Sequence, residues 1–351
     1  MNPVAKFGIA AVIIVMVIVV NFIPNIGLQL SNNGNSSTDV LRIGYFPNIN
    51  HAQAVIGLGN GDFQKVLGNV KVETQLFNAG PSAIEALFAN RVDVTYVGPN
   101  PAINGYIKSD GEALRIIAGA ASGGAVFVVR NDAGINSVDD FADKKFGSPQ
   151  LGNTQDVALR AYLLKNGYKT TENGGNVEVI PAKNADILTL MLKKELDGAW
   201  VPEPWGAKLV KEANGRIFVD ERDLWPQGRF VTAHIIVRTE YLQNHPDVIK
   251  KLLAAHVDET QWINHNKEEA SKVFNTELEK LTGKTIPTDE FQEAFSRMMI
   301  TYDPVKESLF KSANDAFDIG FLGDVKPDLS KIYDLKILNE VLEEKKLETI
   351  S

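Results

Sequence analysis

The feature that most constrains this chain is a block that its sequence contains twice. Residues 83–97 align without gaps with residues 187–201. In both copies an amphipathic run is followed by an aspartate, Asp93 or Asp197, and then by a short strand pattern with an aromatic residue and valine. Each copy leads into a loop marked by prolines. A duplicated block of this kind predicts two structurally similar halves.

The repeat extends upstream, with changes in loop length. The alternating stretch at 69–72 matches the one at 176–179, and before them the strand pattern at 41–44 matches the one at 145–147. A polar loop and a helical run follow each first strand. Both halves therefore read β-α-β-α-β, which is typical of an open, mostly parallel sheet with helices on both faces.

Two such halves predict an α/β fold of two lobes with a cleft between them. Strand-rich runs at 125–130 and 230–238 lie between the copies and after the second one, and we expect them to be crossovers between the lobes. The predicted division is lobe 1 at 40–130, lobe 2 at 131–228, and a return to lobe 1 with C-terminal helices at 229–351. The helices expected in that last part are 246–266, 267–281 and 288–300.

The first 24 residues predict a membrane anchor. Residues 7–20 are apolar or small throughout, and Lys6 precedes them with no further basic residue before Arg42, which orients the N-terminus toward the cytoplasm. The segment lacks a small-x-small cleavage site and a cysteine for lipidation, which favours an uncleaved anchor over a cleaved signal peptide. Secretion after cleavage is the alternative. A polar tether follows at 25–39, so we expect the body of the protein on the extracytoplasmic face of the cell membrane.

Composition and motifs argue against several classes of function. The chain of 351 residues has no cysteine, which excludes disulfides, thiolate metal sites and cysteine nucleophiles. Its net charge of −8 argues against nucleic-acid binding. The sequence has no G-x-S-x-G elbow, Walker A loop or G-x-G-x-x-G fingerprint. We therefore expect no catalytic site, no metal and no cofactor. Separately, we expect the protein to act as a monomer.

Six loops at the carboxyl ends of the expected strands are the candidates for ligand binding. They are rich in glycine, proline, asparagine, serine and threonine and poor in lysine and arginine. A helix that begins in such a loop presents free N–H groups and a partial positive charge, so it can bind an anion without a cationic side chain. Residues 80–82 and 152–154 fit this role at equivalent places in the two halves. Alternatively they are ordinary turns, since Ser82 before Glu85 also fits a capping box.

Three further side chains have two possible roles each. Glu203 stands between two prolines, where it could pair with a ligand ammonium, with Trp205 adding a cation–π contact. Equally, Glu203 could cap a helix while Trp205 fills the core beside the hinge. His51 could donate to an oxyanion or be structural, and His234 is expected in the core on a strand.

Taken together, these loops resemble the ABC substrate-binding proteins for aliphatic sulfonates, taurine and nitrate. The resemblance covers about residues 40–270 and is carried by Gly44-x-x-Pro47, Phe77-x-x-Gly80-Pro81-Ser82, Asp93-Val94-x-Tyr96-Val97-Gly98-Pro99-Asn100-Pro101, Ser148-Pro149-Gln150-Leu151-Gly152-Asn153-Thr154 and Trp200-Val201-Pro202-Glu203-Pro204-Trp205. It implies a periplasmic-binding-protein-like fold with two crossovers, lobes that close on the ligand, and delivery to a permease driven by a cytoplasmic ATPase. The pocket implied by the resemblance comprises His51, Gly80, Pro81, Ser82, Pro99, Asn100, Gly152, Asn153, Thr154 and Glu203, with Trp205 beside it.

The expected ligand is a small anionic solute. A taurine-like organosulfonate is favoured over nitrate because Glu203 would have a use for the ligand ammonium. Within the same superfamily, a receptor for a pyrimidine precursor of thiamine is the alternative. From another class, the alternative is a periplasmic enzyme or a ligand-sensing domain.

Overall fold

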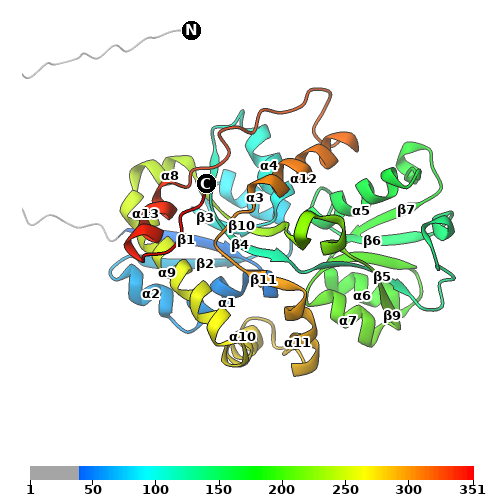
Figure 1. Cartoon of the computed structure of the whole chain (residues 1–351), viewed down its shortest axis with the longest axis horizontal. Helices are drawn as coiled ribbons and strands as arrows, with labels where there is room; N and C mark the ends of the chain where they lie inside the picture. Colours follow the sequence, from blue (N-terminus) through cyan, green and yellow to red (C-terminus); the bar gives the residue numbers. More distant parts are fainter. Residues whose placement is uncertain (1–38) are drawn as a thin grey trace, which may run out of the picture. The chain divides into compact units, whose positions relative to one another are not determined.

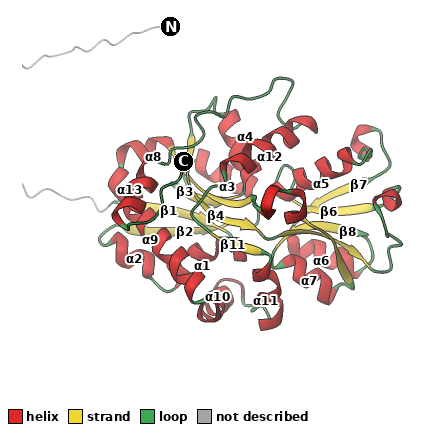
Figure 2. Cartoon of the chain, in the orientation of Figure 1, coloured by secondary structure: helices red, strands yellow, loops and turns green. Residues whose placement is uncertain are grey.

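The computed structural model describes residues 39–351, so the expected anchor at 1–24 and nearly all of the tether at 25–39 lie outside it. The described residues form one compact unit with two sheets, each covered by helices on both faces (Figures 1 and 2). Within this part of the chain, no helix has both the length and the apolar character needed to span a bilayer.

The first sheet and its helices, here called lobe 1, are built from the two ends of the described chain. The sheet has the order β11-β4-β10-β3-β1-β2. Its strands are β1 (Val40–Tyr45), β2 (Lys71–Leu76), β3 (Val94–Val97), β4 (Leu114–Gly123), β10 (Val231–Arg238) and β11 (Met298–Ile300). Its helices are α1 (Ala52–Gly59), α2 (Asp62–Leu67), α3 (Gly80–Phe88), α4 (Pro99–Lys108), α8 (Thr239–Asn244), α9 (Pro246–His265), α10 (Lys267–Thr282), α12 (Lys306–Asp318) and α13 (Lys336–Glu344).

The second sheet and its helices, here called lobe 2, come from the middle of the chain. The sheet has the order β7-β6-β8-β5-β9. Its strands are β5 (Ala125–Arg130), β6 (Lys145–Pro149), β7 (Glu178–Ala182), β8 (Gly198–Pro202) and β9 (Gly215–Asp220), and its helices are α5 (Thr154–Lys165), α6 (Asn184–Leu192) and α7 (Trp205–Glu212). Helix α11 (Thr288–Ser296) packs on α7. Short 3₁₀ turns are η1 (Ile49–His51), η2 (Val138–Phe141), η3 (Thr171–Asn173), η4 (Glu221–Leu224) and η5 (Pro226–Gly228).

The structure confirms the duplicated β-α-β-α-β halves. Strand β1 pairs in parallel with β2 and β3, and β6 pairs in parallel with β7 and β8. The register is also equivalent, because Gly44 lies opposite Thr95 and Gly147 lies opposite Ala199. A Cβ on Gly44 would come within 2.6 Å of the Thr95 Oγ1, so this close strand contact requires glycine.

The two expected crossovers are confirmed as well. Strand β4 passes directly into β5 through Gly123 and Gly124, whose φ angles of 75° and 77° suit glycine. The second connection runs from β9 through η4 and η5 into β10. Strands β5 and β10 are antiparallel to their neighbours and occupy equivalent places in the two sheets. The limits of lobe 2 at 131 and 228 stay a prediction, since residues 39–351 form a single compact unit.

Alternation along the strands places each sheet between two apolar layers. In β5, Val126 and Val128 pack with α6 and α7 on one face, while Phe127 and Val129 pack with α5 on the other. All four side chains are fully buried. A continuous run of apolar β-branched and aromatic residues therefore forms a strand that is covered on both faces.

One expected helix, 288–300, is wrong at its end. Helix α11 stops at Ser296, and Met298–Ile300 forms strand β11, which pairs with β4 at the edge of lobe 1. The backbone turns at Arg297, whose carbonyl accepts the Gly124 N–H at 2.9 Å and whose side chain reaches Glu203. Tertiary contacts to the first crossover therefore override the helical pattern.

The aspartate of the first repeat copy joins strands that are distant in sequence. Asp93 is fully buried just before β3. Its carboxylate accepts the backbone N–H of Arg42 in β1 at 3.0 Å and an Nη2–H of Arg238, at the end of β10, at 3.1 Å. One side chain thus fixes three strands at the same edge of the sheet.

Asp197 makes the equivalent contacts in lobe 2. Its carboxylate accepts the backbone N–H of Lys145 in β6 at 2.9 Å, and it lies 3.6 Å from Nη2 of Arg130 at the end of β5. The Asp197 side chain is 22% exposed, whereas that of Asp93 is 1% exposed. The Asp93 carboxylate in lobe 1 is therefore more strongly desolvated than the Asp197 carboxylate in lobe 2.

We expect Asp93→Ala to lower the free energy of unfolding by about 3 kcal/mol, because a partly buried arginine and a backbone N–H lose their buried partner. The matched variant Asp197→Ala should cost only about 1 kcal/mol, since water can replace the missing carboxylate. Urea unfolding of both variants measures the difference. Equal losses would contradict the role given to burial.

Candidate functional site

The loops at the carboxyl ends of the two sheets face each other, as the loop pattern predicted. After β1 and β8, Trp205 Nε1–H donates to Asn48 Oδ1 across the lobes at 3.4 Å. After β3 and β6, Gly98 lies so close to Thr154 that a Cβ on the glycine would be 2.2 Å from the threonine Oγ1. The junction therefore brings together the ends of four strands, two from each lobe.

Two helices begin at this junction, one from each lobe. Helix α4 begins at Pro99 and α5 begins at Thr154. Thr154 is 6% exposed, and among the described residues its Oγ1 has no hydrogen-bond partner. Asn100 is 2% exposed and donates from Nδ2 to the Ser312 carbonyl at 3.3 Å. Two positive helix ends and an unused buried hydroxyl form an environment that suits an anionic group.

The turn before α5 is held in shape by Asp156. Gly152 has a φ of 75° and donates its N–H to Asp156 Oδ2 at 2.9 Å. The other carboxylate oxygen accepts Ser148 Oγ–H at 2.6 Å and Arg160 Nε–H at 3.1 Å. Asn153 donates from its amide to Gln155 at 3.4 Å. The Gly152 N–H is therefore engaged within the protein, whereas the Thr154 hydroxyl is a side-chain group of this loop without a partner.

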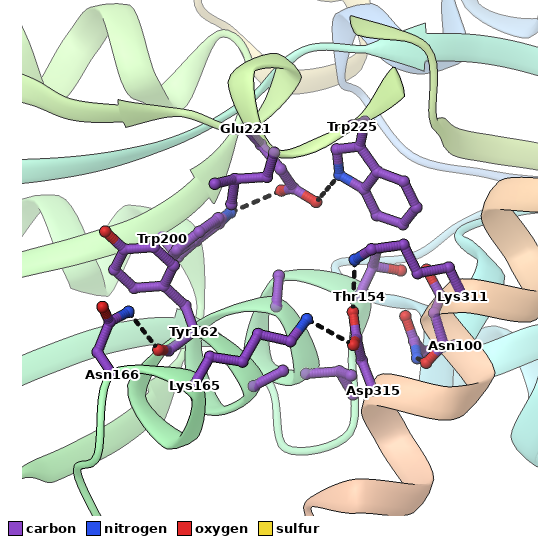
Figure 3. A pocket seen from close by; sticks show the side chains of 15 residues that line it. Asn100, Thr154, Tyr162, Lys165, Asn166, Trp200, Glu221, Trp225, Lys311 and Asp315 are labelled. Carbon is purple, nitrogen blue, oxygen red and sulfur yellow. Dashed lines mark hydrogen bonds and ion pairs between the residues drawn. The ribbon is translucent and has the colours of Figure 1, made fainter. Parts of the chain in front are cut away.

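A cavity of about 210 Å³ opens beside Thr154 and Asn100 (Figure 3). Its walls come from α5, η4 and α12, so both lobes contribute. The residues that decide its chemistry are Tyr162, Lys165, Glu221, Trp225, Lys311 and Asp315. The walls combine aromatic surface with two acids and two lysines, as expected for a site that binds a small polar solute.

Glu221 is the most unusual group in the cavity. It is 4% exposed, and its two oxygens accept indole N–H groups, one from Trp200 at 2.7 Å and one from Trp225 at 3.4 Å. Burial raises the pKa of Glu221 to about 7, although both indole N–H groups favour the ionised form. The carboxyl group therefore changes charge near neutral pH.

Two lysines share one carboxylate on the other side of the cavity. Asp315 lies 2.8 Å from Lys165 Nζ and 3.0 Å from Lys311 Nζ. Lys165 belongs to lobe 2 and Asp315 to lobe 1, so this ion pair bridges the lobes. The Lys311 ammonium also lies 4.0 Å from the centre of the Trp225 ring, which is a cation–π contact.

Glu203 occupies a structural position in this structure. The side chain is fully buried, its Oε1 accepts Arg297 Nε–H at 2.6 Å, and its Oε2 accepts the Ala207 N–H in the first turn of α7 at 3.0 Å. Burial raises the pKa of Glu203, and the nearby Arg297 opposes the shift. These contacts favour the helix-capping alternative over a partner for a ligand ammonium.

The remaining expected site residues have mixed surroundings. His51 is 1% exposed and its ring stacks on the Phe46 ring. The His51 Nδ1 accepts the backbone N–H of Phe46 at 3.3 Å. Burial lowers the pKa of His51 to about 3, so the ring is neutral with its proton on Nε2. Trp205 is half-buried at the start of α7. His234, with its pKa lowered by burial to about 4, lies in the core of β10 as expected.

The loop before α3 contributes packing instead of cavity walls. A Cβ on Gly80 would lie 2.3 Å from Pro101 Cγ, so glycine is needed where α3 meets α4. Pro81 and Ser82 lie in the first turn of α3 and are half-buried. The helix is capped at Ala79, so the capping-box alternative for Ser82 is wrong. Contact of these residues with a ligand stays a prediction.

Sequence reasoning missed four residues that line the cavity together with Thr154. Glu221 and Trp225 lie in the second crossover, and Lys311 and Asp315 lie on α12. The i, i+4 spacing of Lys311 and Asp315 is visible in the sequence, but it is equally typical of a solvated helix face. Nothing local shows that α12 packs against α5, whose Lys165 is 150 residues away from Asp315.

We expect Glu203→Gln to lower the free energy of unfolding of the ligand-free protein by about 3 kcal/mol, because Arg297 stays buried without a full counter-charge. The matched control is Glu293→Gln, since Glu293 also pairs with Arg297, at 3.1 Å, but is 40% exposed. That control should cost only a few tenths of a kcal/mol, roughly the value of an exposed pair. If Glu203→Gln is as stable as the wild-type protein, Glu203 becomes a candidate for ligand contact again.

The comparisons with known proteins agree with this architecture. A sequence model of the NMT1-like family matches residues 34–276. A Brucella abortus relative, described as a binding protein, is 25% identical over 62% of this chain and 68% of its own length. The taurine-binding periplasmic protein of Escherichia coli is 23% identical over 59% of this chain and 62% of its own length.

Among solved structures, the periplasmic aliphatic sulphonate binding protein SsuA from Escherichia coli superposes with a TM-score of 0.68 at 20% identity. The match covers 85% of this chain and 98% of that protein. This likeness confirms the expected two-lobed, periplasmic-binding-protein-like fold of residues 39–351.

Proposed function

The chain belongs to the NMT1-like family, and on this premise we propose that it is the extracytoplasmic solute-binding protein of an ABC importer. It captures a small anionic solute between its lobes and delivers it to a permease that a cytoplasmic ATPase drives. The relatives described as taurine-binding and sulphonate-binding proteins support this function. The chain acts as a monomer and performs no catalysis.

The observation that carries the proposal is the unused hydroxyl of Thr154 at the junction of the lobes. A buried hydroxyl without a partner costs free energy, and a ligand that accepts its hydrogen bond recovers that cost. Because α4 and α5 both begin here, the ligand group that fits is an anion. Binding an anion between the two helix ends also draws the lobes together, as an importer receptor requires.

The ligand that fits best is an organosulfonate. The sulfonate lies at Thr154, and the adjoining cavity of about 210 Å³ holds the organic part. Nitrate would leave most of that volume empty, which makes it the weaker candidate. A pyrimidine would use the aromatic walls but would leave the two helix ends without an anion.

We expect Thr154→Val to weaken binding of ethanesulfonate by about 1–3 kcal/mol, because the isosteric valine removes only the hydroxyl. The stability of the ligand-free protein should not fall, since that hydroxyl has no partner to lose. Ser82→Ala serves as a matched hydroxyl deletion in lobe 1, at a residue outside the cavity walls, and should change affinity less. Isothermal titration calorimetry measures both.

Two results of this titration would contradict the proposal. Absence of ethanesulfonate, taurine and nitrate binding by the wild-type protein would exclude the proposed anion receptor. A larger loss in Ser82→Ala than in Thr154→Val would move the anion to the N-terminus of α3.

We also propose that residues 1–24 anchor the protein to the membrane, with its body on the extracytoplasmic face. The apolar run at 7–20 and the preceding Lys6 support this orientation. Mass spectrometry of isolated membranes should therefore recover peptides that precede Asn25. Recovery of only a mature N-terminus near residue 30 would show that the segment is cleaved.

A further inference from the structure

We infer that Glu221 is the residue that selects among anions, in favour of solutes that carry an ammonium group at the end away from the anion. The inference rests on the proposed function, because it concerns the cavity that adjoins the anion position. It transfers to Glu221 the role that the sequence pattern assigned to Glu203, whose carboxylate is already paired with Arg297.

The first argument is that Glu221 differs in its partners from Asp93, Asp156 and Glu203, the buried acids that fix the strands and loops. Asp93, Asp156 and Glu203 each have an arginine within 3.1 Å. Glu221 has two neutral indole N–H groups instead, and within residues 39–351 no lysine or arginine forms an ion pair with it. A buried carboxylate that is held in place but not neutralised is a ready site for a cation brought by a ligand.

The second argument is the shape and surface of the cavity. The Glu221 carboxylate lies on the same wall as the Trp225 ring, with the Tyr162 ring nearby (Figure 3). Aromatic faces attract alkylammonium groups. The Trp225 ring is already engaged by the Lys311 ammonium at 4.0 Å and by the stacked Phe230 ring, so its part is to hold the Glu221 carboxylate through the indole N–H. Thr154 and Glu221 line one cavity of about 210 Å³, so a short solute can reach both.

The third argument is the balance of charge. The charged groups that face Glu221 are Lys311 and Asp315 from α12 and Lys165 from α5, and the Tyr162 phenol is neutral. When Glu221 is ionised, the two lysines balance the charges of Asp315 and Glu221. A zwitterion keeps this balance, whereas a simple anion adds an uncompensated negative charge near Glu221.

The test compares two ligands that differ only in the ammonium group, taurine and ethanesulfonate. Wild-type protein should bind taurine at least about tenfold more tightly. Glu221→Gln, which keeps an oxygen acceptor for an indole N–H, should remove that preference while ethanesulfonate binds at least as well as before. Asp223→Asn is the matched control, because it removes an exposed acid from the same 3₁₀ turn without touching the cavity. It should leave both affinities unchanged.

The pH dependence in wild-type protein is a second readout that needs no variant. The free protein loses the Glu221 proton near pH 7, and a bound ammonium favours the ionised carboxylate. Affinity for taurine should therefore rise as the pH increases from about 6 to 8, a range in which an alkylammonium stays charged. Affinity for ethanesulfonate should stay level or fall, because an added negative charge favours the protonated acid.

The outcomes separate this inference from the proposed function. Equal affinities for the two ligands in wild-type protein, or a taurine preference that survives in Glu221→Gln, would overturn the role of Glu221 while the anion receptor stands. If wild-type protein binds neither ligand, both proposals fall. Should Glu221→Gln fail to fold, a taurine affinity that does not rise with pH would overturn the inference by itself.

Discussion

The carboxylate of Asp93 is the contact on which lobe 1 depends, and Asp197 repeats it in lobe 2. Each carboxylate lies where parallel strands begin and where an antiparallel strand ends, so it fixes strands from distant parts of the chain at one edge. The opposite edge, at the carboxyl ends of the parallel strands, is where the loops of the two lobes meet and where the cavity opens. The candidate ligand site therefore lies at the end of the sheets away from Asp93 and Asp197.

At the junction, two kinds of polar group lie close together. Glu203 and Asp156 are fully engaged by an arginine and by backbone N–H groups, so they hold the loops in shape. The Thr154 hydroxyl is buried without a hydrogen-bond partner, and the Glu221 carboxylate is buried with two indole N–H groups but without an ion pair among residues 39–351. A buried polar group in this state raises the free energy of the empty protein, and a matching solute lowers it again. We therefore assign Glu203 and Asp156 to the structure of the loops, and Thr154 and Glu221 to recognition of the solute.

The sequence predicted the sheets well because its strongest signal, the repeat, is a property of local patterns. Strand and helix periods, turn residues and the conserved order of elements in the two copies all act within about twenty residues. The junction was predicted less well because its contacts are not local. Glu203 and Arg297 are 94 residues apart, and nothing near either residue indicates the other. The local sequence around Glu203, an acid between two prolines, is compatible with contact to a ligand and equally with contact to an arginine.

The C-terminal part shows the same limit. The pattern at 288–300 is helical throughout, yet the pairing of Met298 with Gly123 converts its end into a strand. Helix α12 has an ordinary amphipathic pattern, so its lysine and aspartate resemble surface residues until α5 is placed beside it. In both places the deciding contact comes from a segment far away in the sequence, β4 for Met298 and α5 for α12.

The position of β10 has a consequence for the order of folding. This strand, at 231–238, lies between β3 and β4 in the centre of the first sheet, although the whole second sheet, at 125–220, precedes it in the chain. Lobe 2 is contiguous, and its first and last strands pair with each other, so it can form as soon as its own residues are available. Lobe 1 cannot close its sheet until residues beyond 230 arrive. A chain that is made, or threaded through a membrane, from its N-terminus therefore keeps its first lobe open until the second is complete, and the lobe that begins first is finished last.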